Sequence, residues 1–142
     1  MKSFSKAMMA ALVATVVLSL LMVMKSAMGI MPQLDLARMI AGVMGMPDVP
    51  AVGWLVHSFI GVVIYGAALA LLDERLPGES RVWHGVLMML LLMPMAGAGL
   101  FGLGLGIWAP VMTLMLHLIF GAVLGAYYGH SLTRVPANRT RT

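Results

Sequence analysis

The strongest constraint on the fold of this chain is a series of four apolar segments, which cover roughly residues 6–30, 51–72, 83–107 and 109–131. Each is long enough to cross the ~30 Å hydrocarbon core of a bilayer at about 1.5 Å of helix per residue. Composition agrees, because 61% of the 142 residues are hydrophobic and only 10% are charged. The sequence therefore predicts an all-α, polytopic membrane protein with four transmembrane helices in a single domain, residues 1–133, followed by a basic cytoplasmic tail at 134–142.

Positive charges indicate the orientation, because lysine and arginine concentrate on the cytoplasmic side of membrane proteins. Seven of the nine basic residues fall on the side of both termini, and only Lys25 and Arg38 fall on the other side. The seven are Lys2, Lys6, Arg75, Arg81, Arg134, Arg139 and Arg141. We therefore expect both termini in the cytoplasm, a chain arranged as two helical hairpins, and basic side chains that meet lipid head groups rather than nucleic acid.

The first external connection has the pattern of a short helix in the membrane interface, over about residues 32–46. Pro32 suits a first helical turn, and Asp35 is favoured near the positive end of a helix dipole. Asp35, Arg38, Gly42 and Gly45 would form a narrow polar or small stripe on this helix. We interpret it as a lid packed over the bundle or, alternatively, as a docking or gating element.

The glycines of the third span match the G-x-G-x-x-G pattern of dinucleotide-binding loops. That pattern binds phosphate where it follows a strand and opens a helix, whereas here it lies inside an apolar span. In lipid, small residues let helix backbones approach closely. We therefore interpret the glycines as helix-packing positions, namely Gly61, Gly97, Gly99, Gly102, Gly106, Gly121, Gly125 and Gly129.

Pro94 interrupts the third span, because it removes a backbone hydrogen-bond donor from the helix. We predict a kink there, or alternatively a broken segment between Pro94 and Gly106 of the kind that lines transport sites.

A weak internal repeat relates the second span to the fourth. The stretches "HSFIGVVIYG" from His57 and "HLIFGAVLGAYYG" from His117 share H-x-x-x-G-x-V. Each histidine has a glycine four residues later, on the same helix face, where another helix can approach. We therefore predict that both imidazoles point into the bundle at one depth, in a buried polar site with Thr113 and Ser58.

An ionisable side chain inside a membrane is costly unless it is satisfied, so the histidine pair is a functional hypothesis. The two rings could ligate a haem iron, bind copper together with thioethers from the 16 methionines, or relay protons. The structural alternative is that each ring bonds only to a backbone carbonyl or to Thr113. That alternative needs no cofactor.

Other catalytic groups are absent from the spans. The chain has no cysteine, which excludes disulfides, thiolate metal sites and cysteine nucleophiles. We predict that no carboxylate is buried or paired as an acid and base, and that His84 and His130 meet water near the cytoplasmic boundary. The sequence therefore predicts no enzymatic activity. The five carboxylates, all in loops or interfacial segments, are Asp35, Asp48, Asp73, Glu74 and Glu79.

Several stretches together resemble a family of small bacterial membrane proteins of unknown function with four spans. They are "MKSAMGIMP", "GWLVHSFIG", "MPMAGAGLFGLG" and "PVMTLMLHLIFGAVLGAYYG", and the similarity extends over about residues 5–130. The resemblance implies a bacterial inner-membrane location and a pair of helical hairpins, with no catalytic residues to carry over.

The sequence as a whole predicts a structural or accessory membrane protein that acts through helix packing, with itself as a homo-oligomer or within a larger membrane complex. The alternatives are a cofactor- or ion-binding protein that uses His57 and His117, and a small transporter.

Overall fold

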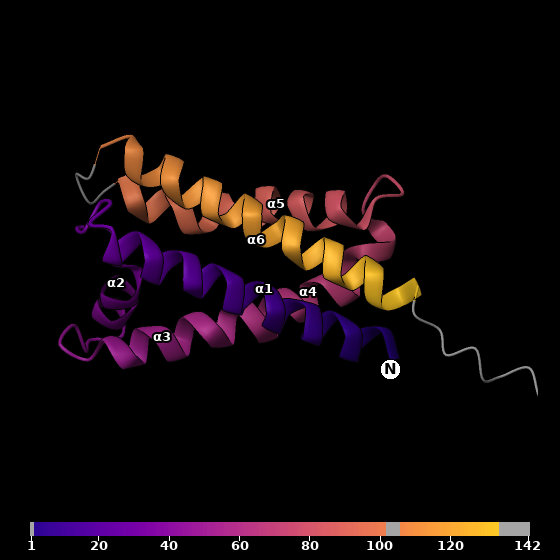
Figure 1. The fold of residues 1–142 in the computed structure, drawn as a ribbon, viewed down its shortest axis with the longest axis horizontal. Helices are drawn as coiled ribbons and strands as arrows, with labels where there is room; N and C mark the ends of the chain where they lie inside the picture. Colours follow the sequence, from indigo (N-terminus) through magenta and orange to yellow (C-terminus); the bar gives the residue numbers. More distant parts are fainter. Residues whose placement is uncertain (1, 102–105, 134–142) are drawn as a thin grey trace, which may run out of the picture.

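A computed structural model describes residues 2–101 and 106–133, and over these residues the chain is helical and contains no strand (Figure 1). The all-α class is therefore confirmed for the described part of the chain. The helices are α1 (Lys2–Ala27), α2 (Leu36–Val43), α3 (Pro50–Phe59), α4 (Tyr65–Leu72), α5 (Arg81–Phe101) and α6 (Trp108–Thr133). A π-helical turn, η1 (Ile60–Ile64), joins α3 to α4, and a 3-10 turn, η2 (Asp73–Arg75), follows α4.

Within the described part of the chain, three helical stretches are long and apolar enough to cross a membrane, namely Ser3–Ala27, Pro50–Arg75 and Trp108–Thr133. The second consists of α3, η1, α4 and η2 in one continuous run. In α5 the apolar stretch with described side chains is Arg81–Leu91. The third span was predicted to reach residue 107, but Gly106 is not helical and has a φ of 71°. Glycine adopts that left-handed conformation readily.

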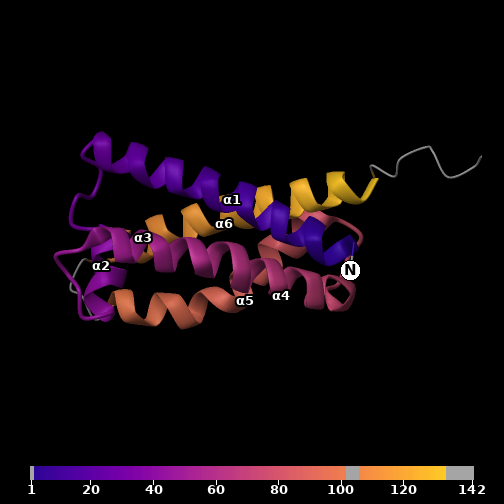
Figure 2. The same ribbon diagram turned by 90° about the horizontal axis from the view of Figure 1, so that it is seen from below.

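The helices lie side by side along one long axis (Figures 1 and 2). The start of α1, the connection from α4 to α5 and the end of α6 lie at one end, and α2 lies at the other end beside the start of α6 (Figure 1). Helix α1 packs against the α3–α4 run and against α6, and α5 packs against α6. A twofold repeat would relate the first span to the third and the second to the fourth. The contact between α4 and α5 would then be as close as the contact between α1 and α6. The described residues of α4 and α5 make little contact, so the predicted duplication finds no support in the packing.

Small residues bring α5 and α6 into backbone contact. A methyl group on Gly85 would overlap the carbonyl oxygen of Gly121, and one on Gly125 would overlap the carbonyl oxygen of Arg81. Gly121 and Gly125, which the sequence assigned to helix packing, thus lie at close backbone contacts between α5 and α6, and Gly85 is a partner that sequence reasoning missed.

The other glycines of the prediction differ in role. Gly61 faces Thr15 of α1, and Gly129 faces the aliphatic part of Arg81. A methyl group on Gly106 would meet nothing within 4 Å among the described residues, so its positive φ, rather than packing, explains the glycine. Gly97 and Gly99 lie within α5, and Gly102 lies outside the described residues. The helix α5 continues through Pro94, and the kink stays a prediction.

The predicted interfacial helix is shorter than residues 32–46, because α2 covers only Leu36–Val43. Asp35 caps its first turn by accepting a hydrogen bond from the backbone N–H of Arg38 at 3.1 Å, which leaves Pro32 in the preceding turn. Ala37 and Ala41 are buried, and a methyl group on Gly53 of α3 would overlap the carbonyl of Ala37. Helix α2 is therefore anchored on α3 by a close backbone contact.

Candidate functional site

His57 of α3 and His117 of α6 line the same cavity, which has a volume of about 700 Å³. Residues from α1, α2, the α3–α4 run and α6 form its walls. Its polar side chains are those of His57, Tyr65, Thr113 and His117, and its other lining residues are apolar or glycine. The structure therefore brings together three of the four residues of the predicted polar site.

Ser58, the fourth, is exposed and does not line this cavity. The prediction of a buried Ser58 is wrong because successive residues of a helix are rotated by about 100°. The turn that directs His57 inward therefore directs Ser58 away.

His117 is held by its own helix. Its Nδ1 lies 2.8 Å from the backbone carbonyl oxygen of Thr113, one turn earlier. A carbonyl oxygen only accepts hydrogen bonds, so Nδ1 carries the hydrogen and donates it. In a neutral ring Nε2 then has a free lone pair. The backbone bond that the sequence suggested for His117 is present.

His57 is buried, with 8% of its surface exposed, and its Nε2 atom has no hydrogen-bond partner. It bonds neither to Thr113 nor to a backbone carbonyl, and its described contact is an edge-to-face one with Trp54, at 5.9 Å between ring centroids. A buried polar atom without a partner costs about 1–3 kcal/mol. Because His57 lines the cavity, a ligand group that reached this nitrogen would be stabilised by it.

A second unpartnered polar atom lies at the same level. Thr15 Oγ1 on α1 is buried without a partner, and it faces Gly61, which lines the cavity one turn after His57. Gly61 lies within η1. Such π-helical turns occur frequently at functional sites, because the extra residue in the turn changes which side chains face inward. The sequence of η1, Ile-Gly-Val-Val-Ile, is apolar throughout and has no signal that would have predicted this turn.

A buried ionic cluster occupies the other end of the molecule. Asp73, at the end of the α3–α4 run, is 4% exposed, and its Oδ2 lies 2.6 Å from Arg81 Nη1. Its Oδ1 lies 2.8 Å from Nδ1 of His84, whose Nε2 lies 2.8 Å from the carbonyl oxygen of Gly78. His84 is 2% exposed. The predictions that no carboxylate is buried or paired and that His84 meets water are therefore wrong, whereas His130 is exposed as expected.

This Asp73–Arg81–His84 cluster joins the two ends of the connection "DERLPGESR" and the start of α5. Asp73 belongs to a polar connection, and the sequence predicted that no carboxylate would be buried. Tertiary packing instead buries Asp73 against the partners that satisfy it. Both ring nitrogens of His84 have oxygen partners within the protein, so this ring has no nitrogen left for a ligand.

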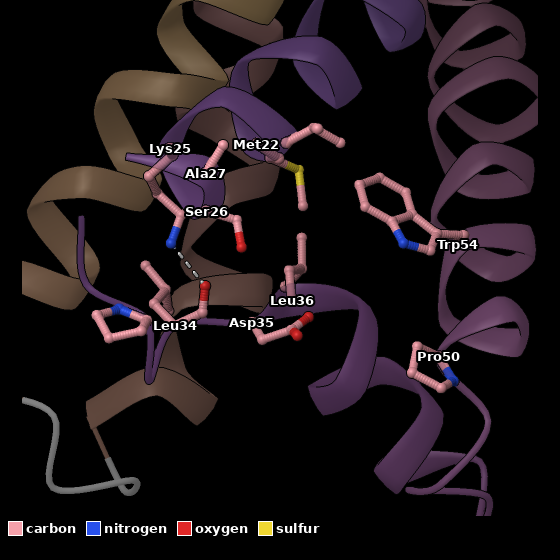
Figure 3. A pocket seen from close by; sticks show the side chains of 11 residues that line it. Met22, Lys25, Ser26, Ala27, Leu34, Asp35, Leu36, Pro50 and Trp54 are labelled. Atoms are coloured by element: carbon pink, nitrogen blue, oxygen red, sulfur yellow. Dashed lines mark hydrogen bonds between the residues drawn. The ribbon is translucent and has the colours of Figure 1, made fainter. Parts of the chain in front are cut away.

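A smaller pocket, of about 380 Å³, lies between the end of α1 and the starts of α2 and α3 (Figure 3). Lys25 Nζ donates to the carbonyl oxygens of Ile30, Met31 and Leu34 at 3.1, 3.0 and 2.9 Å. An ammonium group has three donors, and all three are used here. Lys25 therefore closes the connection between α1 and α2 and offers no free donor to a ligand.

Among residues 2–101 and 106–133, no group of three or more His, Cys, Asp or Glu side chains is arranged to hold a metal ion. That statement does not cover the sulfur atoms of methionine, and Met39 and Met44 line the cavity that contains His57 and His117. The polar chemistry of the cavity is therefore that of two imidazoles, two hydroxyl groups and neighbouring sulfur atoms.

The chain matches, over residues 1–138, the family described as "Family of unknown function (DUF6789)", and it belongs to that family. No curated protein and no solved structure matches it. The family assignment therefore brings no activity or ligand to the site.

Proposed function

We propose that this DUF6789 protein is an integral membrane protein that binds a small, mostly apolar molecule in the His57–His117 cavity. The observation that carries the proposal is that His57 lines that cavity and has a buried Nε2 atom without a hydrogen-bond partner among the described residues. A ligand that supplies a partner for this atom would recover the cost of burying it.

The exposed surface of the helices supports the membrane location. Long apolar side chains such as Leu20, Leu55 and Leu71 are more than half exposed, on helices that are long enough to span a bilayer. In water such a surface would cause association. In lipid it needs no partner. We propose the bacterial inner membrane as the location, with both termini in the cytoplasm, on the basis of the lysine and arginine distribution.

The cavity supports a role in ligand binding. Sites for small molecules have volumes of about 300–1,000 Å³ and are mostly apolar with a few polar groups that orient the ligand. The histidine cavity has this character, with about 700 Å³ and four polar side chains. Lipid-soluble molecules could enter it from the bilayer, because exposed residues such as Val43 and Met44 lie at its edge.

A purely accessory function, through helix packing with another protein, is the less favoured proposal. Among the glycines of α5 and α6 whose surroundings the structure describes, Gly85, Gly121 and Gly125 are the most closely packed, and they are used in the contact between these two helices of one chain. They are therefore covered and do not offer a packing surface to a partner. A transporter, the third proposal, would use the same cavity as its binding site.

The topology can be tested by cysteine labelling, because the chain has no cysteine of its own. Single cysteines at Ser3, Asp48 and Glu79 would be treated with a membrane-impermeant maleimide in whole cells. We expect labelling of Asp48→Cys in intact cells, and of the other two only after the membrane is permeabilised. Recovery of the chain in the soluble fraction, or labelling of Ser3→Cys from outside, would overturn the membrane proposal or its orientation.

The ligand can be tested by analysing what purifies with the protein. The wild type, a His57→Phe/His117→Phe double variant and the control His130→Phe would be purified in mild detergent, extracted with organic solvent and analysed by mass spectrometry, absorption spectroscopy and metal analysis. We expect a stoichiometric organic molecule in the wild type and control that the double variant lacks. Bound haem would identify that molecule. Copper alone, or identical extracts from all three proteins, would contradict the proposal.

A further inference from the structure

We infer that the molecule bound in the His57–His117 cavity is a lipid-soluble phenol, whose hydroxyl group accepts a hydrogen bond from His57 and donates one to His117. This inference rests on the proposed function. It adds the chemical class of the ligand, which follows from the hydrogen-bonding capacity that each imidazole has left.

His117 can only accept. Its Nδ1–H is used by the carbonyl oxygen of Thr113 at 2.8 Å. The remaining ring nitrogen, Nε2, therefore has a lone pair and no hydrogen in the neutral ring. A ligand group that satisfies His117 must carry a hydrogen that it can donate.

His57 can donate. Its position in α3 would allow the same bond from Nδ1 to the carbonyl of Gly53, one turn earlier, but His57 does not make that bond. No hydrogen bond among the described residues holds the hydrogen on Nδ1, so the unpartnered Nε2 can carry it. A ligand group that satisfies this N–H must have an acceptor lone pair. A hydroxyl group meets both requirements with one oxygen atom.

Aromatic side chains in the cavity favour a phenol over an aliphatic alcohol. Tyr65 and Phe120 both line the cavity and contact one another edge to face, with ring centroids 5.4 Å apart. Aromatic rings add favourable edge or offset contacts to such a cluster. The apolar side chains from α1 and α2 would then surround the alkyl part of the ligand. A phenolic hydroxyl is also more acidic than an aliphatic one, and so donates more strongly to an imidazole.

The charge of the cavity argues against a divalent metal ion as the occupant. The lining includes histidine, threonine, tyrosine and methionine, and it includes no carboxylate. A divalent cation bound only by neutral groups would remain an uncompensated buried charge, which is strongly unfavourable. A soft monovalent ion held by imidazoles and thioethers is the competing occupant, and the experiment includes it.

The test compares 4-nonylphenol with 4-nonylanisole, its methyl ether, as ligands of the full-length protein in detergent micelles. The two probes are similar in size and apolarity, but the ether oxygen can only accept. We expect the phenol to bind about tenfold more tightly, as one hydrogen bond in a buried site implies. Binding would be measured from the concentration dependence of the thermal unfolding temperature.

The variants His57→Phe and His117→Phe should each bind the two probes equally, and the exposed control His130→Phe should keep the preference for the phenol. Where a phenylalanine variant does not fold, ¹⁵N NMR of the wild-type histidines provides the readout. The phenol should shift the Nε2 resonance of His117 and leave His84 unchanged.

The outcomes separate this inference from the proposed function. If both probes bind equally to the wild type and more weakly to the histidine variants, the phenol inference is wrong and the cavity is still a ligand site. Tight binding of Ag(I) that excludes the phenol also overturns the inference. If neither probe binds and no molecule purifies with the protein, both proposals fail.

Discussion

The two buried histidines His84 and His57 lie toward opposite ends of the molecule, and their surroundings differ. His84 is 2% exposed, and each of its ring nitrogens has an oxygen partner at 2.8 Å, one from Asp73 and one from Gly78. His57 is 8% exposed and lines a cavity, and its Nε2 has no partner among the described residues. The same residue type therefore stabilises the fold where its hydrogen bonds are complete and marks a binding site where they are not.

The space beside the two histidines differs as well, although a close backbone contact occurs near each, at Gly85 near His84 and at Gly53 near His57. Near His84, glycines place α5 and α6 in backbone contact with no room for a methyl group. Near His57, η1 and α2 surround a cavity of about 700 Å³. Proteins that bind ligands accept a loss of stability at the binding site. We therefore expect substitutions near His84 to destabilise the protein. Substitutions near His57 should change its stability little or increase it.

The largest effect is expected from Asp73→Asn. The substitution removes the buried carboxylate that Arg81 and His84 share, and breaking a buried ion pair costs about 3 kcal/mol or more. The free energy of unfolding should fall by that amount in a denaturant titration in detergent. Asp48→Asn, in an exposed loop, is the matched control and should be close to neutral. Equal stability of the two variants would show that the cluster does not hold this end together.

A smaller loss is expected from Gly85→Ala. The added methyl group would overlap the backbone of α6, which cannot move aside as a side chain can, so the helices must separate at a cost of about 1–3 kcal/mol. Gly42→Ala in α2 is the control, because a methyl group there meets nothing within 4 Å. The control should be neutral or slightly stabilised, since alanine favours helix. Thermal unfolding of both variants would show whether the close contact matters.

The smallest effect, and the only gain, is expected from His57→Phe in protein from which any ligand has been removed. Phenylalanine keeps most of the ring volume and removes the unpartnered nitrogen, so stability should rise by up to about 1 kcal/mol. His84→Phe should instead lose stability, because it leaves Oδ1 of Asp73 and the carbonyl oxygen of Gly78 without their donor. A loss of stability in His57→Phe as large as that in His84→Phe would remove the distinction between the two histidines.

The sequence predicted the features that depend on local pattern. The apolar segments predicted the helices, because a bilayer-length apolar run has one simple solution for its backbone hydrogen bonds. The spacing of His57 and Gly61, and of His117 and Gly121, predicted that both imidazoles face other helices, and both line one cavity.

The features that the sequence did not predict depend on tertiary contacts. Asp73 lies in a polar stretch, and only the fold shows that Arg81 and His84 enclose it. The turn η1 has no local sequence signal, because its residues are all apolar or glycine. Gly85 was missed because its partner lies on α6, more than 30 residues away in the sequence.

The most direct test of this account is the ¹⁵N NMR spectrum of the histidine side chains, since the chain has only four histidines and each can be assigned from one variant. We expect Nε2 of His84 to be of the N–H type, because the carbonyl oxygen of Gly78 can only accept from it. We expect the ring nitrogens of His57 to change when the phenol probe is added, while those of His84 stay the same. A spectrum in which His57 is already hydrogen-bonded without ligand, and does not respond to the probe, would contradict the account.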